Sequence, residues 1–466
     1  MKILLIPFFV LVAESTITAQ QPSSMPSDGR QVKTKEVNKT IQKSGPPIEE
    51  IADKFYNTYE TGVEGLVFSF EKKAGKWRID TRKWQAGNLV PAGNYLFYDI
   101  DSGGYLRLPL PLKKDTLWVD YRLHVDGFEL FNYNLQEYYG YNGWYKDVIT
   151  ALSTKKRLSD SSLNSLARAY SAYGECLLTN QTGDGLQSEL FNLPMTRNCM
   201  TPAQREKYHQ IEKKAILTYA QLNQQNPNFE TIVGKIPIKY ANEVMVEFHT
   251  YLTYADEFAA TFRLPYHLYP DSIVAFARIV LEKCPPDAIL LSLGDNDFYP
   301  MLYAQHQLGV RKDVRLINRN LLGLDRFIYM ATQPQFQSKP VRLSVPLQRY
   351  HENTNDYIYL NDRPEAMPFA EVIDTIQNGH LNENGALTLP SKEFIIKRTL
   401  SAGITTKEDS VRFRETTGYI LKSDWILLDI LNNLDGRRLV CETELDGSLA
   451  PLNVYFTRTD DYLFMY

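Results

Sequence analysis

The sequence predicts a multidomain α+β protein with a β-rich N-terminal domain, a helical middle and a mixed α/β C-terminal domain. Three observations predict this order. Short alternating apolar runs come first, apolar residues at helical spacing follow, and strand-like and helical patterns then alternate to the end. A length of 466 residues is typical of two or three domains. The predicted domains are residues 50–127, 128–284 and 285–466.

The first nineteen residues have the pattern of a secretory signal peptide, here residues 1–19. Lys2 supplies the positive start, and the apolar run from Ile3 to Ala13 is shorter than the ~20 residues that span a bilayer. Residues 20–49 are rich in Gln, Ser, Pro and Lys, which predicts a disordered linker. No later run reaches ~18 apolar residues. We therefore expect an exported chain whose mature form has no transmembrane segment.

Composition excludes several classes of function. A formal net charge of -4 and a pI near 6.1 give no basic surface for nucleic acid. The chain has no Walker loop, no Gly-x-Ser-x-Gly elbow, no His-Glu-x-x-His and no Cys-x-x-Cys pair. For Cys176 and Cys199 two alternatives stay open, a disulfide or buried thiols. Cys284 and Cys441 are expected to be small core residues.

The β-rich part is expected to contain a hairpin at Ala74-Gly75, between apolar runs at 66–70 and 76–79. Residues 128–145 that follow are dense in Tyr, Phe and Trp. Exposed rings could stack on sugars, but packing of the sheet onto the helices is the favoured interpretation.

The middle part carries apolar stripes at helical spacing. Thr201-Pro-Ala-Gln204 resembles a capping box with proline at the first helical position. Paired helices with Ala and Tyr at packing positions suggest a tetratricopeptide-like stack, although no repeat consensus is visible. Such stacks mostly provide binding surfaces, which favours a scaffold.

The most informative segment runs from Ala288 to Leu322. An apolar run ends at Gly294-Asp-Asn-Asp297, a helical pattern follows, and a second apolar run surrounds Val314–Ile317. This order predicts a strand, a turn, a helix and a strand. In open α/β sheets, ligands bind where parallel strands end at their carboxyl side. The acidic turn is therefore the best site candidate in the chain.

Several chemistries suit this turn. Asp295 and Asp297 could hold a divalent cation, accept hydrogen bonds from sugar hydroxyls, or act as acid and base in catalysis. The structural alternatives are that Asp297 caps the next helix and that Gly294 only supplies an unusual backbone angle. Asn296 completes the turn as an amide ligand.

A second polar cluster, Asn318-Arg-Asn320, follows the next strand. If the two strands are parallel neighbours, this cluster lies at the same edge as Asp295. Arg319 could pair with Asp295, with an anionic ligand such as a phosphate or uronate, or in a surface salt bridge. His306 is expected to serve packing or the surface.

Two further expectations concern the end of the chain. Asp424 is expected to cap a late helix, on which Asp429 faces solvent. Residues 343–368 look like a polar, irregular surface insertion.

The acidic turn also carries a family resemblance. Gly294–Asp297 with Pro300, Tyr303, Gln305, Gly309–Arg311, Asp313–Arg315, Asn318 and Leu321-Leu322 resembles a block in bacterial multi-spanning membrane proteins related to protein O-mannosyltransferases. That block lies in a soluble domain of unknown function. The runs 421–430 and 437–440 are similar to its later helix and strand, so the resemblance covers about residues 270–466. The chain departs from the usual residues at Phe298, Leu302 and His306, and the membrane part is missing.

The resemblance therefore implies an exported relative of the family's soluble part, without the transferase activity. We expect a non-catalytic protein of a Gram-negative envelope, periplasmic or at the outer membrane or cell surface. It would bind a glycan or an envelope protein at Gly294, Asp295, Asn296, Asp297, Asn318 and Arg319. The alternative is an enzyme acting on carbohydrate or another envelope polymer through Asp295 and Asp297. A third interpretation gives the turn a structural role only. The sequence does not define a cofactor beyond the divalent cation considered for the two aspartates.

Overall fold

The computed structural model describes residues 45–63, 65–85, 88–179, 193–350, 357–378, 387–397, 410–414, 418–445, 449, 453, 457–458 and 463–465. The chain forms two compact units, and each is described by itself. The first unit comprises residues 1–192 and 202–240, and the second comprises 193–201 and 241–466. The predicted signal peptide and most of the predicted linker lie outside the described residues. The predicted α+β class is confirmed, whereas the domain boundaries at 127 and 284 stay predictions.

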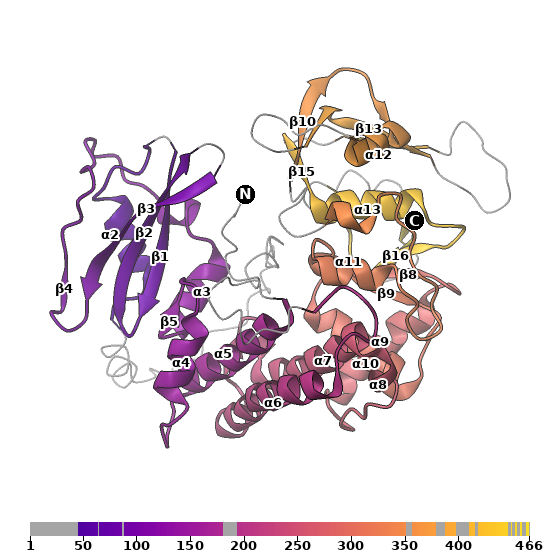
Figure 1. Ribbon diagram of the computed structural model, residues 1–466, viewed down its shortest axis with the longest axis horizontal. Helices are drawn as coiled ribbons and strands as arrows, with labels where there is room; N and C mark the ends of the chain where they lie inside the picture. Colours follow the sequence, from indigo (N-terminus) through magenta and orange to yellow (C-terminus); the bar gives the residue numbers. More distant parts are fainter. Residues whose placement is uncertain are drawn as a thin grey trace, which may run out of the picture. The chain divides into compact units, whose positions relative to one another are not determined.

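The first unit contains a five-stranded antiparallel sheet in the order β4-β3-β2-β1-β5 (Figure 1). The predicted hairpin at Ala74-Gly75 is confirmed, because Lys73 pairs with Lys76 across it. Both turn residues have positive φ angles, 52° and 78°, which suit a tight turn between twisted strands. The strands are β1 (Leu66–Lys73), β2 (Lys76–Gln85), β3 (Asn88–Asp99), β4 (Gly104–Tyr105) and β5 (Tyr138–Tyr139).

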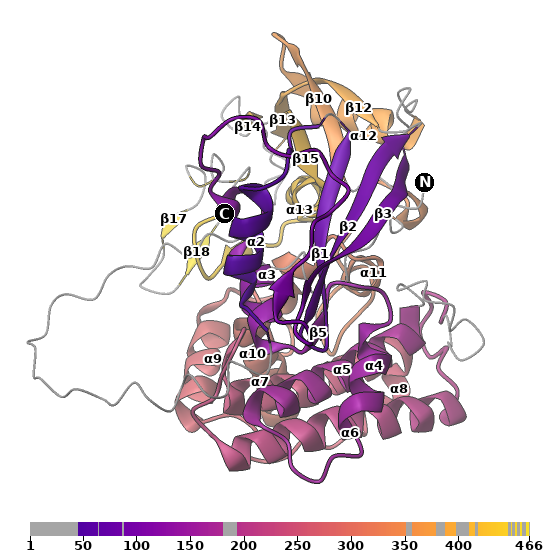
Figure 2. The ribbon, with the colours of Figure 1, turned by 90° about the vertical axis from the view of Figure 1, so that its left-hand side faces the viewer.

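Helix α2 (Ile48–Tyr56) packs on one face of this sheet (Figure 2). Its residues Ile51 and Phe55 are fully buried against Trp77 and Phe97 of the strands. The Phe55 ring meets the Phe97 ring edge-on, with ring centroids 5.9 Å apart. The core of the sheet is therefore largely aromatic.

The aromatic junction after residue 128 is part of this packing. Four of its rings are buried, as the packing interpretation requires: Tyr133, Tyr139, Trp144 and Tyr145. They belong to α3 (Gly127–Leu135), β5 and α4 (Trp144–Leu152). These four rings are consequently not surfaces on which a sugar could stack.

Two long helices, α5 (Asp160–Thr179) and α6 (Pro202–Gln225), complete the first unit. The predicted start of α6 at Pro202 is confirmed. The two helices share an apolar cluster that includes Leu163, Ala167, Tyr219 and Leu222. A short hairpin follows, formed by β6 (Glu230–Thr231) and β7 (Gly234–Lys235). The tetratricopeptide-like assignment of this region stays a prediction.

The second unit is built on a sheet in the order β17-β18-β16-β8-β9. The three strands β16, β8 and β9 run parallel, and every residue in them is buried. Strands covered on both faces read as continuous apolar runs, which explains the run that ends at Leu293. The bounds are β8 (Ile289–Ser292), β9 (Arg315–Asn318), β16 (Leu439–Cys441), β17 (Thr457–Arg458) and β18 (Phe464–Met465).

The predicted strand–turn–helix–strand unit is confirmed. Helix α10 (Asp295–Leu308) connects β8 to β9 and ends at Gly309, whose φ angle of 73° allows the left-handed turn. Four further helices of this unit precede α10 or follow β9: α7 (Ile236–Tyr254, which crosses the division between the units), α8 (Asp256–Ala259), α9 (Asp271–Lys283) and α11 (Asp325–Ala331).

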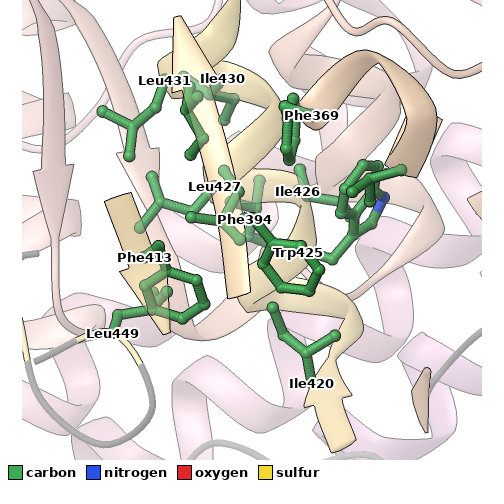
Figure 3. Close-up of a cluster of buried hydrophobic side chains, with 14 of the residues drawn as sticks. Phe369, Phe394, Phe413, Ile420, Trp425, Ile426, Leu427, Ile430, Leu431 and Leu449 are labelled. Carbon is green, nitrogen blue, oxygen red and sulfur yellow. The ribbon is translucent and has the colours of Figure 1, made fainter. Parts of the chain in front are cut away.

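Two small three-stranded sheets and two helices form the remainder of the second unit. The sheets are β12-β10-β15 and β11-β13-β14. Trp425 of α13 (Lys422–Asn432) stacks on Phe369 of α12 (Phe369–Asn378), with centroids 5.1 Å apart. Figure 3 shows these rings among apolar side chains of α13. The strands are β10 (Tyr357–Arg363), β11 (Met367–Pro368), β12 (Thr388–Ser391), β13 (Glu393–Lys397), β14 (Ser410–Arg414) and β15 (Tyr419–Leu421).

The prediction of an irregular insertion at residues 343–368 is wrong for its second half. Strand β10 lies in the middle of its sheet, parallel to β12 and antiparallel to β15. Ile358 and Leu360 are buried while Tyr359 between them is 47% exposed, which is the alternation of a half-buried strand. Flanking polar residues obscured this short pattern.

In the part of the chain that the structure describes, no helix is both long enough and apolar enough to cross a membrane. All four cysteines are thiols in the structure. Cys176 and Cys199 are therefore thiols, as in the second alternative, but only Cys176 is buried and Cys199 is partly exposed. Cys284 and Cys441 are buried, as expected for small core residues.

Candidate functional site

Three parallel strands end side by side in the second unit. Leu291 of β8 is aligned with Cys441 of β16, and Ser292 of β8 is aligned with Asn318 of β9. The residues that follow the three strands therefore lie along one edge, which we call the carboxyl edge. In parallel sheets this is the edge at which ligands bind.

The acidic turn after β8 opens helix α10. Gly294 is the N-cap residue, and its φ angle of -173° is extended backbone that any residue adopts. The expectation that Gly294 supplies an unusual backbone angle is therefore wrong. A Cβ atom at this position would have Asn320 Nδ2 as its nearest neighbour, 3.8 Å away. Neither backbone angle nor crowding requires a glycine here.

Asp295 faces the end of the neighbouring strand. Its Oδ1 accepts a hydrogen bond of 3.3 Å from Asn318 Nδ2. Burial, and then the charge of Asp295, raise the pKa values of Tyr269 and Tyr299. The Asp295 carboxylate thus contributes to a polar environment that includes two buried tyrosines.

Asn296 extends the polar network to helix α7. Its Oδ1 accepts a hydrogen bond of 2.9 Å from Asn242 Nδ2, and Asn242 Oδ1 accepts one of 2.8 Å from the Tyr269 hydroxyl. Asn296 itself is exposed, whereas Asn242 is buried. These bonds fix the orientation of the turn relative to α7 within the second unit.

Asp297 is the third residue of α10. The N-cap residue of this helix is Gly294, so the expectation that Asp297 is the N-cap residue is wrong. Burial raises the pKa of the Asp297 carboxyl. Its carboxyl group is thus partly withdrawn from water.

Arg319 follows β9 in the turn η2 (Arg319–Leu321) and pairs with Asp424 of α13. Their charged atoms are 3.8 Å apart, and their side chains are only 11% and 8% exposed. Asp424 was expected to be the N-cap residue of α13, but the N-cap residue is Leu421. Because Arg319 already pairs with the carboxylate of Asp424, it is less suited to bind an anionic ligand.

Sequence reasoning missed one residue of this edge, Glu442. It directly follows β16 and is aligned beyond Cys441 with the end of β8. Its Oε2 is buried and has no hydrogen-bond partner among the described residues. Burial, and then the charge of Asp297, raise the pKa of Glu442 well above its ordinary value. The available signal in the sequence was an acidic residue directly after a predicted strand. Only the order of the strands in the sheet shows that this residue lies at the carboxyl edge.

Two other titratable residues considered in the sequence analysis, His306 and Asp429, make packing or hydrogen-bond contacts inside the fold. His306 Nε2 is 2.9 Å from the Phe262 carbonyl oxygen, and its ring packs 4.2 Å from the Phe248 ring, as expected for packing. Asp429 was expected to face solvent, but it is fully buried. It lies on the inner face of α13, where it accepts hydrogen bonds from segments distant in sequence.

Within the described ranges, no group of three or more His, Cys, Asp or Glu side chains is arranged to hold a metal ion. Asp295 and Asp297 are therefore not part of a group of three such metal ligands among the described residues. What the edge offers is carboxyl and amide oxygens with hydrogen-bonding capacity, which is the chemistry of sugar hydroxyl recognition.

Residues 273–458 match the family model described as TMEM260-associated domain 2. The match supports the presence of a domain of unknown function from a TMEM260-like family in this part of the chain. It includes every residue of the carboxyl edge discussed above. No curated protein and no solved structure matches the chain.

Proposed function

We propose that this chain is a cell-envelope protein that binds a glycan, a glycosylated protein or another envelope protein without catalysing a reaction. The carboxyl edge is the binding site. The hydrogen bond between Asn318 and Asp295 carries the proposal, since it joins the ends of two parallel strands in one polar surface. The residues assigned to binding are Gly294, Asp295, Asn296, Asp297, Asn318 and Arg319.

The character of the ligand follows from the groups at this edge. Carboxyl and amide oxygens accept hydrogen bonds, and the amides of Asn296 and Asn318 also donate. Sugar hydroxyls both donate and accept, so they suit such a surface. The charge of Arg319 is balanced by Asp424, which supports a neutral ligand over a phosphate or uronate.

Several finer parts belong to the same proposal. The chain would be exported through its signal peptide at residues 1–19 to the periplasm or surface of a Gram-negative cell. Its relation to protein O-mannosyltransferases and its bacterial origin rest on the sequence resemblance. The helices between 128 and 284 would form a tetratricopeptide-like surface for a protein partner.

A second candidate is an enzyme that acts on carbohydrate or another envelope polymer. The raised pKa of Asp297, caused by burial, favours this candidate, since a general acid must hold its proton near neutral pH. Asp295 accepts a hydrogen bond from Asn318 and would serve as the ionised partner. This enzyme would need a divalent cation at Asp295 and Asp297 only if its reaction were metal-assisted.

A thermal-shift screen of the full chain tests binding. Methyl glycosides of mannose, glucose and galactose, larger envelope glycans and divalent cations are added to the wild type and to Asp295→Asn. A ligand that binds only the folded state raises the midpoint of unfolding by mass action. We expect a glycan to raise the wild-type midpoint and to leave the Asp295→Asn midpoint unchanged.

Asp271→Asn is the matched control, because Asp271 is also an aspartate in the first turn of a helix of the second unit and its side chain is 95% exposed. It should respond to the glycan like the wild type. If no glycan shifts the wild type, or if Asp295→Asn responds equally, binding at this edge is contradicted. Glycan release from an added polymer, lost in Asp297→Asn, would establish the enzyme instead.

A further inference from the structure

Glu442 occupies a position on the carboxyl edge that the proposed function does not yet use. It follows β16, and β16 lies on the opposite side of β8 from β9. The acidic turn of β8 therefore has Asn318 and Arg319 on one side and Glu442 on the other. The edge is complete only when all three strand ends are considered.

The side chain of Glu442 is incompletely satisfied in this position. Its Oε2 is buried, yet it forms no hydrogen bond within the part of the chain that the structure describes. A buried polar atom without a partner lowers stability, because it has given up hydrogen bonds to water. Folding alone gives no reason to place a glutamate here, since an apolar residue would avoid this loss.

The charge of Asp297 makes ionisation of Glu442 still less favourable. Asp297 at the start of α10 raises its pKa further, after the larger effect of burial. The cation at this edge, Arg319, pairs with Asp424 and affects Cys441 next to Glu442. The charge of Asp297 therefore acts unfavourably on Glu442 near the ends of β8 and β16, and one buried oxygen of Glu442 has no hydrogen-bond donor within the described residues.

We propose that Glu442 is a ligand-binding residue whose unpartnered oxygen receives a hydrogen bond from a hydroxyl group of an uncharged sugar. This inference rests on the proposed function and extends the site to the third strand end. An anion is disfavoured because it would meet the carboxyl groups of Asp297 and Glu442. A hydroxyl group supplies the missing donor without requiring either carboxyl group to lose its proton.

The raised pKa of Glu442 fits this ligand class. A carboxylic acid that retains its proton both donates and accepts hydrogen bonds, as a sugar hydroxyl does. An ammonium group would instead draw both carboxyl groups into the charged form and release protons. The sugar and ammonium alternatives can therefore be separated by adding each class of compound.

The test compares Glu442→Gln with Glu444→Gln in the full chain. Glutamine keeps the size of the side chain, removes its charge and replaces one carboxyl oxygen by an amide group that donates hydrogen bonds. Glu444 is exposed and lies two residues further along, so it is the matched control. We expect Glu442→Gln to raise the midpoint of thermal unfolding by about 2 °C or more, and the control to shift it by less than ~1 °C.

Ligand responses are measured in the same assay with methyl mannoside, methyl glucoside, glucosamine and glucuronate. The proposal expects the neutral glycosides to stabilise the wild type and Glu444→Gln, but to stabilise Glu442→Gln less by at least half. It is overturned if Glu442→Gln lowers the midpoint, if its midpoint equals that of the control, or if only glucosamine or glucuronate stabilises the wild type.

The failure of this inference differs from the failure of the proposed function. If the neutral glycosides stabilise the wild type and Glu442→Gln equally while Asp295→Asn does not respond, the edge binds sugars and Glu442 takes no part. If no glycoside stabilises the wild type, the sugar ligand is wrong for both. A raised midpoint of Glu442→Gln would then report only a poorly satisfied carboxyl group.

Discussion

Two carboxyl groups of the second unit, one fully buried and one with a buried oxygen, differ in how the fold surrounds them. Asp429 accepts hydrogen bonds from the Ser344 backbone N–H at 2.8 Å, the Tyr350 hydroxyl at 3.1 Å and Asn433 Nδ2 at 2.8 Å. Glu442 has a buried oxygen with no such donor in the described ranges.

Burial, the largest effect in each case, raises the pKa of both residues, and only at Asp429 do hydrogen bonds oppose it. The difference teaches that a perturbed carboxyl group is not by itself a sign of function. A carboxyl group that the fold fully satisfies stabilises the fold. We interpret one that the fold leaves unsatisfied at a strand end as a candidate for ligand binding.

The largest expected effect is that of Asp429→Ala. The change leaves the Ser344 N–H, the Tyr350 hydroxyl and the Asn433 amide without their acceptor inside the protein. We expect the free energy of unfolding to fall by about 3 kcal/mol or more, measured by urea unfolding. The exposed Asp374→Ala on α12 serves as the control, and an equal loss for both variants would show that the Asp429 network stabilises nothing.

A smaller effect is expected for Arg319→Gln. Asp424 would keep its buried carboxylate but lose its cationic partner, which costs about 2 kcal/mol in a partly buried pair. Arg278→Gln is the control, because the pair of Arg278 and Glu282 is more than half exposed and contributes little. A loss for Arg319→Gln no larger than that of the control would place the pair among ordinary surface pairs.

The stability of Glu442→Gln relative to the wild type should depend on pH. The pKa of Glu442 is raised in the folded chain, so the folded chain binds this proton more tightly than the unfolded chain. Stability then falls as pH rises from the ordinary carboxyl value of about 4.3 toward the raised folded value. Glutamine lacks this proton, so the stability of the variant relative to the wild type should increase as the pH rises through that range.

Urea unfolding at several pH values between about 4 and 8 measures this gain. The charged group that acts on Glu442 is Asp297, which opposes its ionisation. Arg319 acts on the adjacent Cys441. A difference between variant and wild type that stays constant with pH would contradict the raised pKa.

The smallest effect is expected for Asp297→Asn. Burial alone raises the pKa of Asp297, and its side chain remains partly exposed. We expect a gain in stability of about 0.5 kcal/mol. In the double variant with Glu442→Gln, the gain in stability should be smaller than the sum of the two single gains. Each single change already removes the same repulsion between Asp297 and Glu442. Full additivity would show that the two carboxyl groups do not interact.

Local patterns in the sequence predict the elements that surround the site. The apolar run before Gly294 and the second run around Val314 each fall on a buried parallel strand, because parallel strands are covered on both faces. The turn at Ala74-Gly75 is likewise local. The proximity of Asp295 and Asn318 follows from these two strands and from the rule for carboxyl ends.

Contacts between distant segments could not be predicted in this way. Glu442 becomes part of the edge only because Cys441 pairs in register with Leu291, and no local pattern encodes that register. The burial of Asp429 depends on Ser344 and Tyr350, from a stretch whose polar composition suggested a surface insertion. Polar residues that satisfy one another inside a core look like surface residues in a sequence.

The most direct test of this account compares two neutral replacements in one experiment, Asp429→Asn and Glu442→Gln, by thermal unfolding of the full chain at neutral pH. Each replaces a carboxyl group that has at least one buried oxygen by an amide of the same size. The account predicts shifts of opposite sign, a lower midpoint for Asp429→Asn and a higher midpoint for Glu442→Gln. Lower midpoints for both variants would contradict it, because Glu442 would then stabilise the fold as Asp429 does.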